Sequence, residues 1–456
     1  MQSQRENALQ YAHQHREQSL ELLTEILRIP SISTEPANSP DVRRAAEWIA
    51  TQLSSLGMKS VQIFPTAQHP IVYGEWLAVK GAPTVLIYGH CDVQPTDPLE
   101  LWKTGPFEPS VRGEDLFGRG AADMKGQLLA AMQAVRALIA TGGLPVNIKW
   151  LIEGEEEVGS PNLAPFIANH KELLACDFAL NPDAGIIGPD APAITYALRG
   201  LAFFELHVHG PAGDLHSGVY GGVVHNPANA LAELIAGMHD ANGRITLPGF
   251  YDKVRPLSKE ERDELARLPT DEKHFLAQTG SPALYGEAGY TPGERVSARP
   301  TLDVNGMLSG FTGSGAKTVI PAHAMAKISL RLVPDQDPVE VTRQFRSYLE
   351  ANAPQDIRWE LIEMHGAPAS ISSRENIGVC AMAMAMESVW GMKPFFKREG
   401  GSIPVVLQMQ RLLGIESVIA GFGLPDDNVH APNEKLHLPT WYKGIETLIH
   451  FFLNLK

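Results

Sequence analysis

The chain has 456 residues, 44% of them hydrophobic and 20% charged, which excludes a disordered or collagen-like protein and predicts two domains rather than one. The formal net charge of −14 argues against nucleic acid as a partner, because phosphate binding needs a positively charged face. The three cysteines, Cys91, Cys176 and Cys380, are too few for a disulfide framework and favour a reducing compartment. No secretory signal and no apolar run of membrane-spanning length is visible, so we expect a soluble, cytoplasmic protein with no membrane partner.

The first 200 residues have the pattern of an α/β domain. Apolar residues recur at helical spacing over 20–27, and a second helix is expected over 42–56. The short apolar runs 84–90 and 146–152 predict buried strands of the kind found in parallel sheets, and 124–140 between them predicts a helix. Strand, helix and strand in this order indicate an α/β fold.

The pattern changes near residue 199. Alternating apolar residues over 204–208 predict a half-buried antiparallel strand, followed by an amphipathic helix over 227–238. The stretch 247–300 is expected to be rich in loops. A further strand over 326–333 and a helix over 338–351 complete what we interpret as a separate α+β domain with one solvated sheet face.

Beyond residue 374 the chain returns to α/β character, with helices expected over 377–389 and 440–454 and a short strand over 417–421. The predicted fold is therefore α/β with a mixed sheet, interrupted by an inserted α+β domain. We expect the α/β domain to comprise 1–198 and 374–456 and the insertion to comprise 199–373.

Polar side chains gather where the predicted strands end, which is where open α/β sheets bind ligands. His90 and Asp92 follow the first buried strand and project to one face, as an imidazole and a supporting carboxylate would at a metal site. Asp123 follows a glycine-rich segment and opens a helix; it can be a helix N-cap or a ligand.

Three adjacent carboxylates, Glu155, Glu156 and Glu157, follow the second buried strand, and they are either a solvated charge run or neighbours of a cation. Asp183 and His430 lie at two more strand ends. Histidines and carboxylates are ligands typical of Zn²⁺ or Mn²⁺, and a carboxylate that bridges two ions is a common hydrolytic design.

His207 and His209 also form a His-x-His pair, on the expected antiparallel strand of the inserted domain. We interpret them as surface or sheet residues rather than as ligands.

Taken together, the motifs resemble the M20 family of metallopeptidases, nearest its dipeptidase branch, which includes cytosolic non-specific dipeptidase and carnosinase. The segments that carry the resemblance appear in family order and span most of the chain: 89–95, 118–126, 153–160, 214–218, 317–321, 398–404 and 426–434. Met124 departs from the asparagine that is frequent at its position.

The resemblance implies two divalent metal ions per subunit, with Zn²⁺ expected first and Mn²⁺ as the alternative. It implies that His90 and Asp183 bind one ion, that Glu157 and His430 bind the other, and that Asp123 bridges them. It also implies a cis peptide between Asp123 and Met124.

The remaining site roles follow from the same resemblance. Glu156 is the expected general base, and Asp92 is expected to orient His90. His216, in the inserted lid and dimerisation domain, is expected to reach the active site of the partner subunit in a homodimer. The expected substrate-binding residues are Thr318, Arg331, Glu399, Gly401 and Ser402.

The expected activity is hydrolysis of dipeptides and short peptides by a metal-activated water molecule. Two alternatives remain open at this point. An N-acyl amino acid deacylase or desuccinylase of the same family would share every metal ligand and differ in the substrate pocket. A catalytically inactive member that serves as a dimeric scaffold is disfavoured by the complete ligand set and by Glu156.

Overall fold

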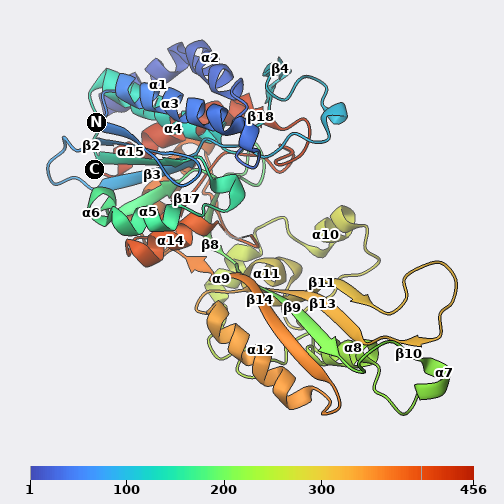
Figure 1. The fold of residues 1–456 in the computed structure, drawn as a ribbon. Coiled ribbons are helices and arrows are strands. Elements are labelled where there is room, and N and C mark those ends of the chain that lie inside the picture. The colour runs from blue at the N-terminus through green and yellow to red at the C-terminus, as the bar shows by residue number, and fades with distance from the viewer. Residues whose placement is uncertain (1, 402) are drawn as a thin grey trace. The chain divides into compact units, whose positions relative to one another are not determined.

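The computed structural model describes residues 2–401 and 403–456 and divides the chain into two compact units (Figure 1). Unit 1 comprises Met1–Tyr196, Ser372–Lys397 and Pro404–Lys456, and unit 2 comprises Ala197–Ile371 and Arg398–Ile403. The ranges predicted from the sequence differ in one notable respect. They assign the segment Arg398–Ile403 to the α/β domain, whereas it packs with unit 2.

Unit 1 is built on a mixed sheet, as the sequence predicts. Strand β3 pairs in parallel with β6 and β7, and β7 pairs in parallel with β17, whereas β2 is antiparallel to β6. The order is β1-β2-β6-β3-β7-β17-β8-β15, with β16 pairing β8. The strands are β1 (Lys59–Phe64), β2 (Ile71–Trp76), β3 (Thr84–His90), β6 (Asn147–Glu153), β7 (Phe178–Asn181), β8 (Ala193–Leu198), β16 (Phe395–Glu399) and β17 (Ser417–Ile419), together with β15 (Ser370–Ile371). The residues of β15, and Ala197 and Leu198 with which they pair, fall within unit 2.

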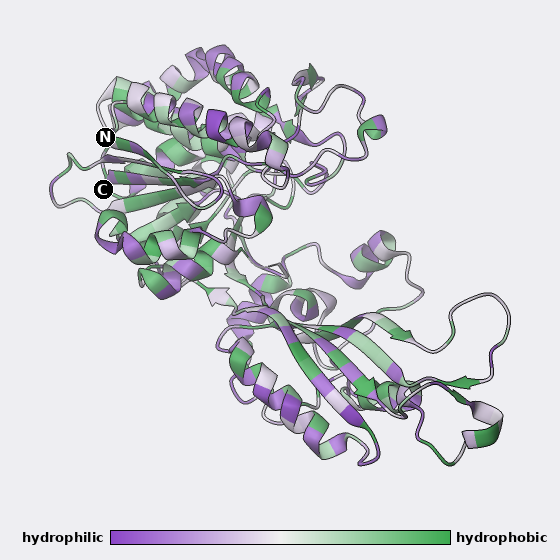
Figure 2. Cartoon of the chain, viewed as in Figure 1, coloured by the Kyte–Doolittle hydropathy of each residue, from purple (hydrophilic) through white to green (hydrophobic). Residues whose placement is uncertain are grey.

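Helix α4 lies at the centre of the helical layer of unit 1. It is rich in alanine and leucine and is buried on nearly every side, because α1 and α15 pack against it. The strands beside it are mostly hydrophobic, as Figure 2 shows. The helices of unit 1 are α1 (Gln2–Gln14), α2 (Arg16–Leu27), α3 (Ser39–Ser55), α4 (Lys125–Thr141), α5 (Leu163–Asn169), α6 (Lys171–Leu174), α13 (Ile377–Trp390), α14 (Pro404–Leu412) and α15 (Leu438–Asn454).

Unit 2 contains a four-stranded antiparallel sheet in the order β11-β13-β9-β14. These strands are β9 (Gly200–His209), β11 (Thr301–Ser309), β13 (His323–Leu332) and β14 (Arg358–Ala367). Burial alternates strictly along β9, so Phe204, Leu206 and Val208 enter the core under α8 (Pro227–Gly237) and α12 (Pro338–Asn352). The other face of β9 is only half-buried.

The stretch that the sequence predicted to be rich in loops holds three short helices: α9 (Lys259–Leu265), α10 (Glu272–Thr279) and α11 (Pro292–Ala298). Each begins with a capping side chain, from Ser258, Asp271 and Thr291. Thr291 and Glu294 form a capping box. Helices this short have too few turns to be recognised from the spacing of their apolar residues. Their capping residues are the local sequence signal that marks where they begin.

The remaining strands and helix are short. They are β4 (Ser110–Arg112), β5 (Asp115–Phe117), β18 (Lys435–His437), β10 (Leu215–His216), β12 (Val319–Ile320) and α7 (Ser217–Tyr220). Within residues 2–401 and 403–456, no helix combines the length and the apolar character that crossing a membrane requires.

Candidate metal centre

Four elements of unit 1 bring the predicted ligands to one edge of the sheet. His90 ends β3, and its neighbour in register on the parallel strand β6 is Glu153, which precedes the acidic turn. Asp183 follows the end of β7, and His430 lies in the loop after β17. Because these strands are parallel, their carboxyl ends meet at the same edge, and residues far apart in the sequence become neighbours.

Asp123 occupies the middle of this group. Its Oδ1 lies 3.1 Å from Nε2 of His90, and its Oδ2 lies 2.9 Å from Nε2 of His430. Nε2 of His90 is also 3.7 Å from Oδ2 of Asp183, and Nε2 of His430 is 3.2 Å from Oε2 of Glu157. The two oxygens of one carboxylate therefore face two separate histidine–carboxylate pairs.

This arrangement fits divalent cations. Ligand atoms of His90, Asp123 and Glu157 lie within 4.8 Å of one another, and ligands of one tetrahedral zinc ion are typically about 3.3 Å apart. The group also contains more acidic than basic side chains, although most of it is shielded from solvent. The carboxylates of Asp92, Asp123, Glu156, Glu157 and Asp183 lie beside two imidazoles. Buried charge without a counter-charge is costly, and metal ions would supply that charge.

Asp92 connects the histidine to the acidic turn. Its backbone oxygen is 3.1 Å from Nδ1 of His90 and its Oδ1 is 3.5 Å from the same nitrogen, so Nε2 is left to face Asp123. The Asp92 carboxylate also accepts the backbone N–H groups of Glu156, at 3.3 Å, and Glu157, at 3.0 Å. One buried carboxylate thus fixes the orientation of an imidazole and of two consecutive glutamates.

The three consecutive glutamates have different surroundings. Glu155 is buried and accepts hydrogen bonds from Thr66, from the backbone of His69 and from Asn162. The Glu157 carboxylate accepts a hydrogen bond of 2.8 Å from Gln94 and faces His430. Among the described residues, none forms a hydrogen bond to the Glu156 carboxylate, which lies near the charges of Asp183, Glu157 and Asp123.

Burial is the main reason that the pKa of Glu156 is raised to about 8, and the nearby charges of Asp183, Glu157 and Asp123 raise it further, against the opposite effect of His90. Burial and the charge of Asp123 likewise raise the pKa of Asp183. Such shifts mark a place where negative charge is crowded. Perturbed carboxylates in one cluster are a common feature of functional sites.

His430 lies in a tightly wound loop. Asn428, His430 and Asn433 all have positive φ angles, of 54°, 61° and 61°, which residues other than glycine seldom adopt. Buried Asp427 supports the loop by accepting the backbone N–H of Leu424 at 2.6 Å. Hydrogen bonds to Asp123 and then Glu157 raise the pKa of His430 to about 10, which again reflects the surplus of carboxylates.

Glu434 is a residue of the site that the sequence argument did not identify. Its carboxylate is buried and accepts four hydrogen bonds, from the Arg119 guanidinium and from the backbone N–H groups of Gly120, Ala122 and Asp123, all between 2.9 and 3.1 Å. It therefore holds the whole turn that presents Asp123. The peptide between Asp123 and Met124 at this turn is cis, as the resemblance implies.

We expect Glu434→Gln to destabilise the protein by about 3–5 kcal/mol, because it leaves the buried Arg119 charge without its counter-ion and turns an amide N–H₂ toward backbone donors. Since the variant also loosens the turn of Asp123, metal affinity should fall by about 10–100-fold. Denaturant unfolding and equilibrium dialysis would measure these effects. Glu350→Gln, at an exposed position of α12, is the matched control and should change neither quantity.

The other predicted site residues belong to unit 2. His216 of β10 and Thr318 lie side by side, with Nε2 of His216 3.5 Å from Oγ1 of Thr318, and both are exposed. The imidazole is held by the backbone N–H of Gly218, which donates to its Nδ1 at 2.9 Å. Glu399 accepts the backbone N–H of Arg199 through its carbonyl, and Gly401 has open space around it. Ser402 lies outside the described residues.

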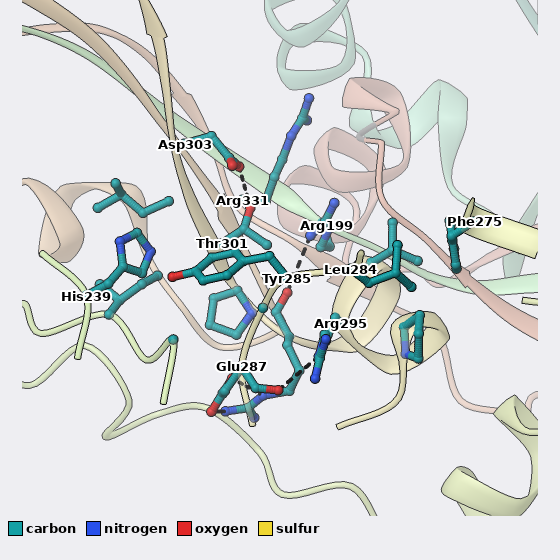
Figure 3. A pocket seen from close by; sticks show the side chains of 18 of the residues that line it. Arg199, His239, Phe275, Leu284, Tyr285, Glu287, Arg295, Thr301, Asp303 and Arg331 are labelled. Atoms are coloured by element: carbon teal, nitrogen blue, oxygen red, sulfur yellow. Dashed lines mark hydrogen bonds and ion pairs between the residues drawn. The ribbon is translucent and has the colours of Figure 1, made fainter. Parts of the chain in front are cut away.

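Arg331 lines a cavity of about 380 Å³ within unit 2 (Figure 3). Three more arginines, Arg199, Arg295 and Arg299, line the same cavity. Arg299 is neutralised by Glu287, with contacts of 2.8 Å. Within the part of the chain that the structure describes, no hydrogen bond or ion pair reaches the Arg331 guanidinium, which makes it available to an anion.

Comparisons with known proteins agree with this geometry. Residues 86–454 match peptidase family M20/M25/M40. The chain is 32% identical over 461 residues to the Cys-Gly metallodipeptidase DUG1 of Candida albicans, covering 95% of this chain and 94% of that protein. It is 30% identical over 468 residues to the Beta-Ala-His dipeptidase of Homo sapiens, covering 99% of this chain and 92% of that protein.

A solved structure extends the likeness to three dimensions. The M20 family metallo-carboxypeptidase Sso-CP2 from Sulfolobus solfataricus superposes with a TM-score of 0.81 at 33% identity, covering 96% of this chain and 99% of that chain. The predicted α/β fold and the predicted resemblance to the M20 family and its dipeptidase branch are confirmed. The chain therefore belongs to peptidase family M20/M25/M40 and is a metallopeptidase.

Proposed function

We propose that this metallopeptidase hydrolyses dipeptides and short peptides at a two-metal centre. The observation that carries the proposal is the position of Asp123, whose two oxygens face His90 and His430 separately. In the proposed centre His90 and Asp183 hold one ion, Glu157 and His430 hold the other, and Asp123 is shared. Two imidazoles with several carboxylates suit Zn²⁺ first and Mn²⁺ as the alternative.

When bound, the ions would lower the pKa of a water molecule and polarise the scissile carbonyl. Glu156 is the general base in this proposal: its carboxylate would take a proton from the attacking water and deliver it to the leaving amine. The support for this role is its position beside Glu157, with the backbone N–H of both residues held by Asp92. Asp92 would keep His90 and Glu156 in fixed relative positions.

The residues of unit 2 would hold the substrate. Arg331, which has no counter-ion among the described residues, would pair with the C-terminal carboxylate of a peptide through a bidentate contact. Glu399, Gly401 and Ser402 would accommodate the amino end. Two anchors of opposite charge, at a fixed separation, would favour very short peptides. Relatives that cleave Cys-Gly and β-Ala-His dipeptides support this substrate class.

Two other substrate classes compete with free dipeptides. The likeness to the carboxypeptidase Sso-CP2 favours removal of the last residue from longer peptides as a second candidate function. An N-acyl amino acid deacylase would use the same metal ligands and would accept a substrate whose amino group is acylated. Both alternatives retain the carboxylate anchor and dispense with recognition of the free amine.

A matched substrate panel tests the proposal. Each dipeptide is assayed beside its N-acetyl derivative and beside the same two residues at the end of a five-residue peptide, with Zn²⁺- and Mn²⁺-reconstituted protein. We expect the free dipeptide to have the highest kcat/KM, because only it satisfies both charged anchors. Faster turnover of the acetylated compound or of the longer peptide would overturn the dipeptidase assignment in favour of the corresponding alternative.

We also propose that the active unit is a homodimer in which His216 acts in the partner subunit's site, where it would hold the developing oxyanion together with Thr318. The support is the exposure of both side chains and their adjacency. His216 belongs to unit 2, whereas the proposed metal ligands belong to unit 1. The three free cysteines fit a reducing compartment such as the cytoplasm.

Complementation tests the dimer. His216→Ala and Glu156→Gln proteins should each be inactive, but in a mixed dimer one site receives both defects and the other receives neither. If subunits exchange freely, about a quarter of the wild-type activity should return, because half of the dimers are mixed and each has one intact site. Exchange that is demonstrated by mass tagging but restores no activity would contradict action in trans.

A further inference from the structure

Three histidines of unit 2 gather on the open face of the four-stranded sheet. His207 and His209 are two residues apart on β9, so both side chains project to the face opposite the core residues Leu206 and Val208. His323 begins β13 and is the direct cross-strand partner of His209. Three imidazoles therefore share one patch, although the third lies more than 100 positions along the chain from the first two.

The rings are in mutual contact. Nδ1 of His207 lies 2.9 Å from Nε2 of His323, and the ring centroids of His209 and His323 are 4.7 Å apart. One nitrogen from each of the three rings can be chosen so that all three atoms lie within 4.8 Å of one another. Nitrogen ligands of a single tetrahedral zinc ion are about 3.3 Å apart, so small rotations of the rings would bring the three nitrogens to coordination distance.

The surroundings of His207 support coordination through Nδ1. Its other ring nitrogen, Nε2, lies 3.3 Å from Oε2 of Glu205, which fixes the proton on that side and leaves Nδ1 as the ligand atom. Glu205 is in turn held by Lys327 at 2.9 Å. A ligating histidine with a carboxylate behind it is the usual design of a protein metal site.

The flanking charges are mixed. Glu360 of β14 is the cross-strand partner of His207, whereas Arg358 is the partner of His209 and is exposed. The carboxylates of Glu205 and Glu360 favour a cation, and an exposed guanidinium is free to turn toward solvent. A simple hydrogen bond between two neutral imidazoles would explain His207 and His323, but it gives no role to His209.

We propose that His207, His209 and His323 bind one Zn²⁺ ion at a site separate from the catalytic centre. Three imidazoles on two adjacent strands leave the fourth tetrahedral position open to water or to a small exogenous ligand. A donor set made only of imidazole selects zinc, copper or nickel over manganese or magnesium, which prefer oxygen. The site differs in this respect from the carboxylate-rich centre of unit 1.

The test is a metal count on the full-length protein. Wild type, His323→Ala and His365→Ala are dialysed against the same buffered concentrations of free Zn²⁺ and analysed for bound zinc. His365, on the neighbouring strand β14 and stacked on Phe203, is the matched control. We expect wild type and His365→Ala to bind one zinc equivalent more than His323→Ala, with peptidase activity unchanged in all three.

Two further measurements sharpen the result. With Mn²⁺ in place of Zn²⁺ the difference between wild type and His323→Ala should vanish. Glu205→Gln, which keeps all three imidazoles, should weaken binding at this site by about 10–100-fold, and it serves if His323→Ala does not fold. Equal zinc content in wild type and His323→Ala across the titration, or no effect of Glu205→Gln, would overturn the site and leave an imidazole–imidazole hydrogen bond.

Discussion

Glu156→Gln is expected to lower kcat by about 10²–10⁴-fold while both metal ions stay bound. The substitution keeps the size of the side chain, and the backbone N–H of residue 156 can still donate to Asp92, but an amide cannot accept a proton from water. In the acidic turn, Glu155 accepts a hydrogen bond from the backbone of His69, and Glu157 faces His430. The carboxylate of Glu156 has neither of these contacts. Removal of its basic function should therefore affect turnover and leave structure and metal content alone.

Steady-state kinetics on the best dipeptide, together with elemental analysis of the same sample, would measure both parts of this expectation. Glu172→Gln, at an exposed position of α6, is the control for the chemical change. If Glu156→Gln keeps kcat within about tenfold of wild type, a barrier change below about 1.4 kcal/mol, then Glu156 is not the base.

Asp123→Ala is expected to remove both metal ions at once. Its two oxygens face the two histidines at 3.1 and 2.9 Å, so the substitution would remove the proposed shared ligand and also the negative charge between the histidines. The protein should still fold, because methyl replaces carboxylate at a position that carries surplus negative charge, and activity should fall to background.

Elemental analysis after gel filtration would decide the matter. Asp190→Ala, whose carboxylate is 97% exposed, is the control and should retain full metal content. Asp183→Ala makes the comparison sharper, since it should lose only the ion that Asp183 and His90 are proposed to hold. One tightly held equivalent in Asp123→Ala would show that the carboxylate is not shared.

Much of the fold could be predicted from local pattern. The strand expected over 84–90 is observed as β3 (Thr84–His90), and the helix expected over 338–351 is observed as α12 (Pro338–Asn352), capped by Asp337. In both elements most of the apolar residues of the sequence are buried. A local sequence pattern predicts such an element, because the spacing of its apolar residues matches the repeat of a strand or a helix. The half-exposed strand β1 and the short helices α9–α11 were not predicted, because half-exposed or very short elements lack that periodicity. Strand β2 was also not predicted, although four of its six residues are buried.

The ligand types, and their place at the ends of strands, also follow from the sequence, as do the motifs that resemble the M20 family. The residue pattern alone does not say which glutamate of the acidic turn faces the centre; the roles of Glu156 and Glu157 came from the resemblance to the M20 family. Three identical side chains in a row differ only in the direction in which the turn presents them, and that direction is set by the hydrogen bonds of Asp92 to the backbone of Glu156 and Glu157.

Only the tertiary structure revealed the partners that lie far apart in the chain. Glu434 reaches the turn of Asp123 across 311 positions, and His323 reaches His207 across 116. Neither residue has a local pattern that points to its partner, since a lone glutamate or histidine on a strand or loop has no periodicity to reveal it. The sequence by itself determined the elements and the chemistry available at their ends, because both are local properties. Packing decided which of those groups meet, because strand order and cross-strand register bring together residues that no local pattern relates.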